Sequence, residues 1–101
     1  MSILHTINKS PFDRNSLASC LRVAKEGSSV LLIEDGVYAA LKGSEHSSAV
    51  ENAMKGIKFY ALGPDLSTRG VADKVMDGIE VVDYTGFVDL AEKHKSVQSW
   101  L

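Results

Sequence analysis

The sequence is poor in cysteine: its 101 residues include a single one, Cys20. A lone thiol cannot form a disulfide within the chain, and it completes neither a CxxC redox motif nor a cysteine-based zinc site. His46 and His94 have no cysteine or paired carboxylate beside them at metal-ligand spacing. We therefore expect a reducing compartment and neither a metal nor another cofactor.

Long hydrophobic runs and basic runs are also missing. The apolar runs are far shorter than the ~20 residues that a membrane-spanning helix needs, and residues 1–5 lack the features of a secretory signal. The formal net charge is −2, and lysines and arginines are scattered rather than clustered with aromatic residues. These absences predict a cytoplasmic protein without membrane contact and without direct nucleic-acid contact.

Glycine-rich phosphate loops are absent as well, because neither Gly63-Pro64-Asp65 nor Gly70 has the required spacing between a strand and a helix. What the chain does have is 45% hydrophobic residues. A chain of this length buries roughly 60–65% of its unfolded surface, which gives a modest core. We expect one domain, residues 1–101, whose core other subunits could extend.

The most informative stretch is Val30–Ile33, four apolar residues in a row. A strand without polar alternation is typical of a parallel sheet covered on both faces, so this stretch is predicted to lie at the sheet's centre. Glu34, Asp35 and Gly36 follow it, and residues 37–41 have the composition of a short helix. The acidic pair is therefore expected at the carboxyl edge of the sheet, where ligands of α/β proteins bind.

Further strands are expected at 3–7, 57–62 and 79–82, and helices at 16–26, at 47–54, from Pro64 and from Thr85. Residues 71–77 fit either a helix continuation or a loop, and the apolar tail 97–101 is left unassigned. Strands that alternate with helices predict an α/β fold with a mostly parallel sheet of four or five strands and helices on both faces. Thr85 is the predicted cap of the last helix.

Cys20 lies near the apolar stripe of the helix expected at 16–26, and two interpretations stay open. A free cysteine on such a face packs as a small hydrophobe. Alternatively it is a persulfide-carrying or redox thiol, but Arg22, the nearest base in sequence, would point away from it on a helix.

Other reactive side chains have simpler interpretations. Glu34, Asp35 and Asp83 fall at strand ends, where a carboxylate before a helix most simply caps it. His5 is interpreted as a hydrogen-bonded core or strand-end residue, and His46 and His94 as solvated side chains.

The order and spacing of several segments resemble the DsrH/TusB family across essentially the whole chain. They are residues 4–11 (LHTINKSP), 31–41 (LLIEDGVYAAL), 60–62 with Asp65-Leu66 and Arg69-Gly70, 82–88 (VDYTGFV) and Trp100. The resemblance implies a small three-layer DsrE-like fold. It also implies an α2β2γ2 heterohexamer with DsrE-like and DsrF-like, or TusD-like and TusC-like, subunits. Such complexes relay persulfide sulfur to or from a DsrC/TusE-like carrier.

Two branches of the family differ in where the sulfur goes. Dsr complexes work in sulfur oxidation, and Tus complexes supply 2-thiouridine at the tRNA wobble position. DsrH-like members can carry a cysteine at the place of Cys20, which favours the DsrH branch and makes Cys20 a candidate auxiliary persulfide carrier. The main sulfur-accepting cysteine belongs to the DsrE or TusD subunit, so whether this chain is itself an enzyme stays open.

The last helix and the tail carry more apolar residues than one helix face of a small domain easily buries, among them Phe87 and Trp100. Together with the resemblance, this surplus makes Phe87 and Trp100 candidates for contact with partner subunits.

Overall fold

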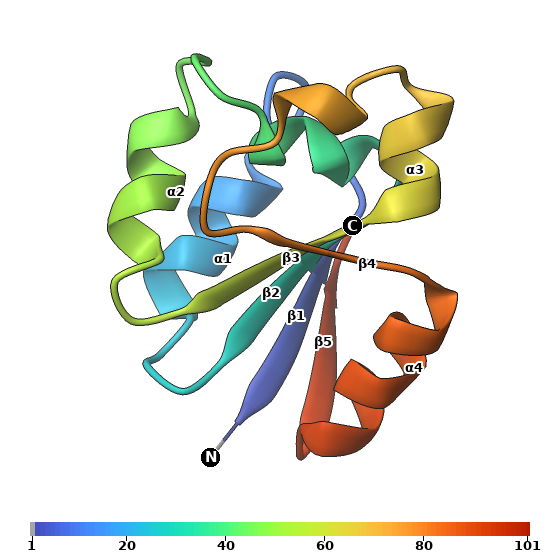
Figure 1. Ribbon diagram of the computed structural model, residues 1–101. Helices are drawn as coiled ribbons and strands as arrows, with labels where there is room; N and C mark the ends of the chain where they lie inside the picture. The colour runs from blue at the N-terminus through green and yellow to red at the C-terminus, as the bar shows by residue number, and fades with distance from the viewer. Residues whose placement is uncertain (1) are drawn as a thin grey trace.

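The computed structural model describes residues 2–101, which form five strands alternating with helices (Figure 1). The strands are β1 (Ile3–Ile7), β2 (Ser29–Leu32), β3 (Lys58–Leu62), β4 (Glu80–Val82) and β5 (Ser96–Trp100). The α-helices are α1 (Ser16–Val23), α2 (Ser47–Ala53), α3 (Gly63–Thr68) and α4 (Tyr84–Lys93), and the 3₁₀ helices are η1 (Glu34–Ala40) and η2 (Ala72–Lys74).

The five strands form one sheet in the order β4-β3-β2-β1-β5, and every pair is parallel. β2 is the central strand, and all four of its residues are buried. This confirms the prediction made from the unbroken apolar run. A strand covered on both faces has no solvent-facing positions, so polar residues do not alternate along it.

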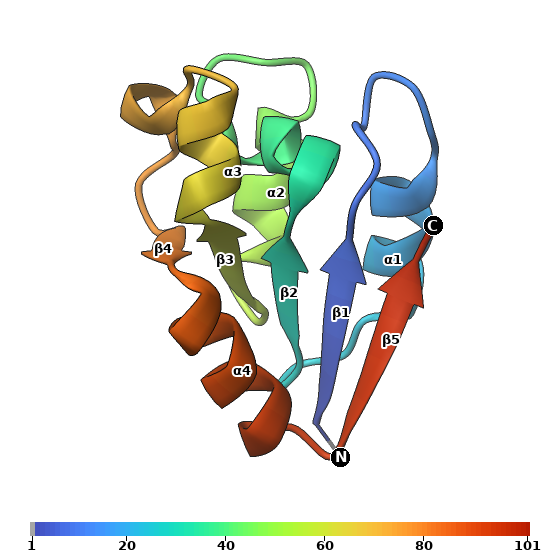
Figure 2. The same cartoon turned by 90° about the vertical axis from the view of Figure 1, so that its right-hand side faces the viewer.

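Helices cover both faces of the sheet, as Figures 1 and 2 show: α1 and α2 lie on one face and α4 on the other. The connections from β1 to β4 step across the sheet in one direction, whereas the connection from β4 returns past β1 to β5. Because parallel crossovers are right-handed, a reversed step places its helix on the opposite face. The α/β class and the three-layer arrangement are confirmed.

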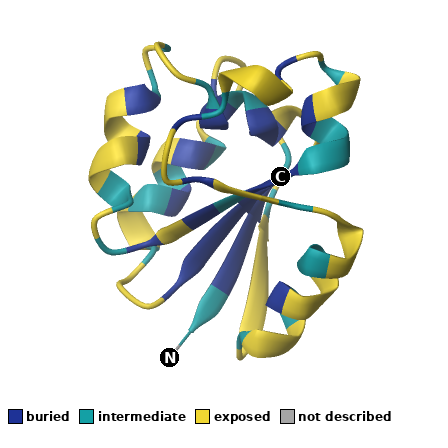
Figure 3. Ribbon diagram, in the orientation of Figure 1, coloured by how far each residue is buried: buried dark blue, intermediate teal, exposed yellow. Residues whose placement is uncertain are grey.

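The core is divided by the sheet into two unequal parts. The larger cluster lies on the side of α1 and α2 and includes Ile7, Cys20, Leu32 and Phe59. The smaller one, Leu4, Leu31 and Leu90, lies under α4. Figure 3 shows burial concentrated in β1, β2 and β3, while β5 and much of α4 are exposed.

The tail forms a strand that the sequence did not reveal. β5 pairs with β1 along its whole length, from Ile3 opposite Ser96 to Ile7 opposite Trp100. Four of its five residues are exposed, because β5 is an edge strand. Ser96, Gln98 and Ser99 interrupt its apolar residues, so the tail lacks the apolar run of a buried strand.

Two helix boundaries differ from expectation. The first helix ends at Val23 rather than at residue 26, because the backbone is extended at Ala24. Gly27, at φ 92°, lies in the loop that follows this helix. At the last helix, Asp83 rather than Thr85 is the cap, and its Oδ1 accepts a hydrogen bond from the Gly86 amide at 2.8 Å.

Gly36 holds η1 close against the end of β1. A Cβ at this position would overlap the carbonyl oxygen of Ile7. The same oxygen accepts a hydrogen bond from the Ile33 amide at 3.0 Å. The absence of a side chain at Gly36 therefore fixes how the chain leaves β2 and enters the carboxyl edge of the sheet.

Candidate functional site

Ligands of α/β folds bind at the carboxyl edge of the parallel sheet, where helix N-termini and loops gather. Residues 8–15 follow β1, 33–46 follow β2 and include η1, and the start of α3 follows β3. Figure 1 shows these segments grouped at one end of the sheet. Polar side chains form two clusters among them.

The first cluster joins the segments after β2 and β3. Arg69 donates from Nε (2.9 Å) and Nη2 (2.8 Å) to Oδ1 of Asp35, and from Nη1 to the Asp65 carbonyl oxygen (3.1 Å). Asp65 in turn accepts the Glu34 amide hydrogen at Oδ2, 2.7 Å away. The cluster ties α3 to η1.

These contacts correct the capping interpretation of Glu34 and Asp35. η1 has no side-chain cap, and Asp35 pairs with Arg69 instead. Glu34 adopts φ 49°, a left-handed conformation that is unusual for a residue with a side chain. Asp65 supports this conformation because its carboxylate satisfies the Glu34 amide. The partners are more than 30 residues apart, so no local sequence signal identifies them.

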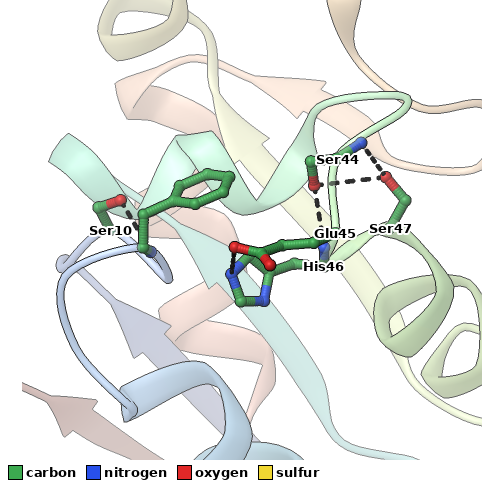
Figure 4. A network of polar contacts seen from close by, with 6 residues as sticks. Ser10, Ser44, Glu45, His46 and Ser47 are labelled. Atoms are coloured by element: carbon green, nitrogen blue, oxygen red, sulfur yellow. Dashed lines mark hydrogen bonds and ion pairs between the residues drawn. The ribbon is translucent and has the colours of Figure 1, made fainter.

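The second cluster joins the segments after β1 and before α2, and it is drawn in Figure 4. The Phe12 ring meets the His46 ring edge to face, with centroids 4.8 Å apart. The His46 amide donates to Ser44 Oγ (3.1 Å), and the Ser44 amide donates to Ser47 Oγ (2.9 Å). The Glu45 carboxylate lies 3.8 Å from His46 Nε2. His46 is thus half-buried and held in place, not solvated as expected.

Two hollows adjoin these clusters. One of about 80 Å³ lies between α1 and α2, lined by Pro11, Arg14, Asn15, Leu17, Ala18, Leu21, His46 and Ala49. A wide depression of about 450 Å³ lies at the ends of β3 and β4, lined by Gly63, Pro64, Val81, Val82, Asp83 and Gly86. The smaller one is well below the size of ordinary ligand pockets, and in the larger one Asp83 is already engaged as a cap.

Cys20 lies away from this edge, fully buried in the larger core cluster. Burial raises the pKa of its thiol to about 12. Since only the thiolate attacks sulfur, the thiol is unreactive in this conformation. Its surroundings favour the packing interpretation, and the carrier role stays a prediction.

His5 and Trp100 form a hydrogen bond across the pair β1 and β5. The indole Nε1–H donates to Nδ1 of His5 at 3.1 Å, which confirms a hydrogen-bonded core position for His5. An indole can only donate, so His5 Nδ1 must be unprotonated, and burial lowers the pKa of this histidine.

The two interface candidates both have partners within the chain. Trp100 is half-buried against the larger core cluster, and Phe87 is half-buried against Leu4 and Leu31 on the side of α4. Their contact with other subunits stays a prediction.

His94 links α4 to the central strand. Its Nδ1 donates to the Leu90 carbonyl oxygen (2.7 Å), and its Nε2 accepts from Ser29 Oγ (3.0 Å). The interpretation of His94 as solvated was wrong, because its partner Ser29 is 65 residues away in sequence.

The described residues show no built metal site and no long apolar helix. Within residues 2–101, no three side chains of His, Cys, Asp or Glu lie where they could share a metal ion. No helix in that range is both long and apolar enough to cross a bilayer.

Comparison with known sequences shows the family to which the chain belongs. Residues 9–97 match the family described as "DsrH like protein". Protein TusB of Shigella flexneri and Protein TusB of Escherichia coli K12 are each 41% identical over 98 residues, covering 97% of this chain and all of the relative. The chain belongs to the DsrH/TusB family.

Solved structures show the same fold at low sequence identity. The ychN protein of E. coli superposes with a TM-score of 0.82 at 16% identity, covering 98% of both chains. MTH1491 of Methanobacterium thermoautotrophicum, a protein of unknown function, gives a TM-score of 0.76 at 21% identity and covers 96% of this chain and 97% of its own. These likenesses confirm the fold and carry no function.

The burial of Cys20 predicts slow reaction with a thiol reagent such as a dinitrobenzoate disulfide. At about pH 8, Cys20 in the native chain should be labelled only as fast as local or global unfolding exposes it. In the denatured chain the same thiol should be labelled rapidly. A matched control is Ala18→Cys in a Cys20→Ala background, because Ala18 is exposed on the same helix. That variant should react at once in the native state. Equally rapid labelling of native wild type would contradict the buried assignment.

The His5 contact predicts a stability that depends on pH. The pKa of His5 lies below its ordinary value of 6.5 in the folded chain, so the unfolded chain takes up the proton first as pH falls. The stabilisation from neutral His5 is therefore complete above about pH 6.5 and is lost as pH falls through the folded-state pKa. Urea unfolding between about pH 7.5 and 5 should show this loss. His5→Gln, which keeps an acceptor for Trp100, should flatten the profile, and an unchanged profile would contradict the assignment.

Proposed function

We propose that this chain is a noncatalytic subunit of a cytoplasmic sulfur-relay complex that supplies sulfur for 2-thiouridine at the tRNA wobble position. The observation that carries the proposal is the 41% identity to Protein TusB over the full length of that relative. The relay itself and its destination come from the family resemblance. With a formal net charge of −2 and no basic cluster, the chain is proposed not to touch the tRNA.

The thiol environment supports the noncatalytic part of the proposal. The one cysteine of the chain is buried, and its pKa of about 12 leaves almost no thiolate at neutral pH. The principal sulfur-accepting cysteine is proposed to belong to a TusD-like partner. This chain would complete the assembly and shape that partner's site.

The exposed surface supports an assembly role. β5 is an edge strand, and Val97 (47% exposed) and Leu101 (80% exposed) lie on it or just beyond it. Tyr84 and Val88 expose more than half of their area on α4. Exposed edge strands and apolar patches are commonly covered by partners. We propose TusD-like and TusC-like subunits in an α2β2γ2 hexamer, with a TusE-like protein as the sulfur carrier.

Sulfur oxidation in a DsrEFH-type complex is the second candidate function. The match of residues 9–97 to the family described as DsrH like protein favours it. The argument for that branch depended on Cys20 as a helix-one thiol, and its burial weakens the argument. We therefore propose sulfur supply for tRNA thiolation ahead of sulfur oxidation.

Complementation tests the proposed destination of the sulfur. Expressed in an E. coli strain without its own TusB, the chain should restore wobble 2-thiouridine, measured by mass spectrometry of digested tRNA. Cys20→Ala should restore it equally, because the proposed role needs no thiol. The proposal fails if the chain co-purifies with TusC and TusD of that strain and thiolation stays absent. Loss of function in a folded Cys20→Ala variant would instead revive the carrier hypothesis.

Assembly is tested by co-expression with the two paralogous subunits and size-exclusion chromatography. If Trp100 is an interface anchor, Trp100→Ala should raise the dissociation constant of the complex more than about tenfold and so reduce co-elution. The reason is that buried aromatic anchors commonly contribute more than about 2 kcal/mol to the free energy of binding. Val23→Ala, an exposed apolar site at the end of α1 and outside the proposed surface of β5 and α4, is the control for Trp100. A Trp100→Ala variant that loses thermal stability but assembles normally makes Trp100 purely intramolecular. A wild-type chain that stays monomeric beside both paralogues contradicts the assembly role.

A further inference from the structure

The wide depression where β3 and β4 end lies at one edge of the sheet. In Figure 2, β4 occupies that edge, with α3 above it and α4 below it. The lining combines one carboxylate, Asp83, with five glycine, proline and valine residues, so most of it is apolar. A water takes about 30 Å³ in the liquid, so a depression of about 450 Å³ has room for a large side chain of another protein.

Large apolar residues on β4 and α4 are left uncovered. Val81 on β4 is 50% exposed, and Tyr84 and Val88 on α4 are 59% and 58% exposed. Tyr84 and Val88 are four residues apart, so they lie on one face of the helix. Within eight consecutive positions the chain thus exposes three large apolar side chains, one of them in the depression itself. Clustered exposure of this kind is typical of a contact surface.

The charge of this part of the chain is one-sided. Residues 75–92 contain β4 and most of α4, and they include no lysine or arginine. Their five carboxylates are all exposed, and they belong to Asp77, Glu80, Asp83, Asp89 and Glu92. Outside this stretch the chain has all 11 of its basic residues and eight of its 13 acidic residues, a formal charge of +3. The negative excess of the chain therefore comes from this stretch.

The nearest cations leave these carboxylates unpaired. Arg69, after α3, donates to Asp35 from Nε (2.9 Å) and Nη2 (2.8 Å) and is thus directed to η1. Lys58 lines a small hollow together with Glu80, but the two form no ion pair in the part of the chain that the structure describes. Lys93 lies in the last turn of α4, at the far end of that helix from the depression.

Asp83 has a carboxylate oxygen to spare at the depression. Its Oδ1 accepts the Gly86 amide hydrogen at 2.8 Å and so caps α4. A carboxylate accepts hydrogen bonds at both oxygens, and Oδ2 has no such contact within residues 2–101. A cation of a partner can therefore bind Oδ2 while the cap stays in place.

We propose that this depression is the docking site for a basic segment of a partner protein, in which an apolar side chain stands between lysines or arginines. The apolar side chain lies against Val81 and Val82, and its removal from water favours the contact. The flanking cations lie near Asp83 and Glu80. Complementary charge steers such a segment to this surface, and an acidic segment is repelled.

The probe is a blocked pentapeptide with one leucine between two pairs of lysines, titrated into the full chain at neutral pH. The backbone amide signals of Gly63, Val81, Val82 and Gly86 should shift in NMR spectra and saturate. Serine in place of the leucine should weaken binding at least about fivefold, because no apolar group then enters the depression. Glutamates in place of the lysines should abolish the shifts. Absence of saturable shifts at these amides, or equal binding of the three peptides, would overturn the proposal.

Matched pairs of substitutions test the charge. Glu80→Gln with Asp83→Asn removes two charges beside the depression, and asparagine caps helices as well as aspartate does. Asp13→Asn with Glu51→Gln removes two exposed charges from other elements. At about 0.1 M salt, which screens distant charges, the first variant should bind the lysine peptide about threefold or more weakly and the second should bind like wild type. Equal weakening in both variants would mean that only the net charge matters, against the proposal.

Self-association is separated from docking of a partner by sedimentation of the free chain. Wild type should stay monomeric at the concentrations of the titration. The comparison variant is Val81→Thr, which keeps a β-branched side chain and makes it polar. Association of wild type that Val81→Thr abolishes would assign the depression to a second copy of this chain and overturn the proposal. These measurements use the free chain, so they succeed or fail independently of the proposed sulfur-relay function.

Discussion

The parallel pairing of β1 with β2 on one side and β5 on the other is the interaction on which the rest of the structure depends. It places the first and last strands of the chain side by side, and the end of β1 lies against η1, where Gly36 allows the close approach. The hydrogen bond from Trp100 to His5 spans the same pair of strands. Without β5, that histidine would lose its partner and β1 would become the exposed edge of the sheet.

Burial decides the chemistry of the thiol. A cysteine on the first helix would be a plausible sulfur carrier if it faced solvent or a cation, because either would favour the thiolate. Cys20 instead faces the larger core cluster, and its pKa rises to about 12. Successive residues of an α-helix lie about 100° apart around its axis, so a cysteine one position away would face a different direction. Whether a thiol on this helix is buried or reactive therefore depends on the face that carries it.

The polar side chains of the carboxyl edge serve mainly to hold loops. Asp65 and Arg69 connect α3 to η1, and Asp83 caps α4. Groups that are already engaged are poorly placed to act on a substrate, whereas the exposed apolar residues of β5 and α4 remain free for contact. These two surfaces are the basis of the proposal that the chain contributes shape to an assembly rather than a reacting group.

The sequence by itself determined the α/β class, the central position of β2 and the short helix α3 with Pro64 in its first turn, because each follows from a local pattern. An unbroken apolar run requires burial on both faces, and a proline fits the first turn of a helix. Only the tertiary structure decided the partners of His5, Asp35 and His94 and the strand formed by the tail. Those contacts join residues 34 to 95 positions apart, and β5 gains its conformation from pairing with β1 rather than from any periodicity of its own.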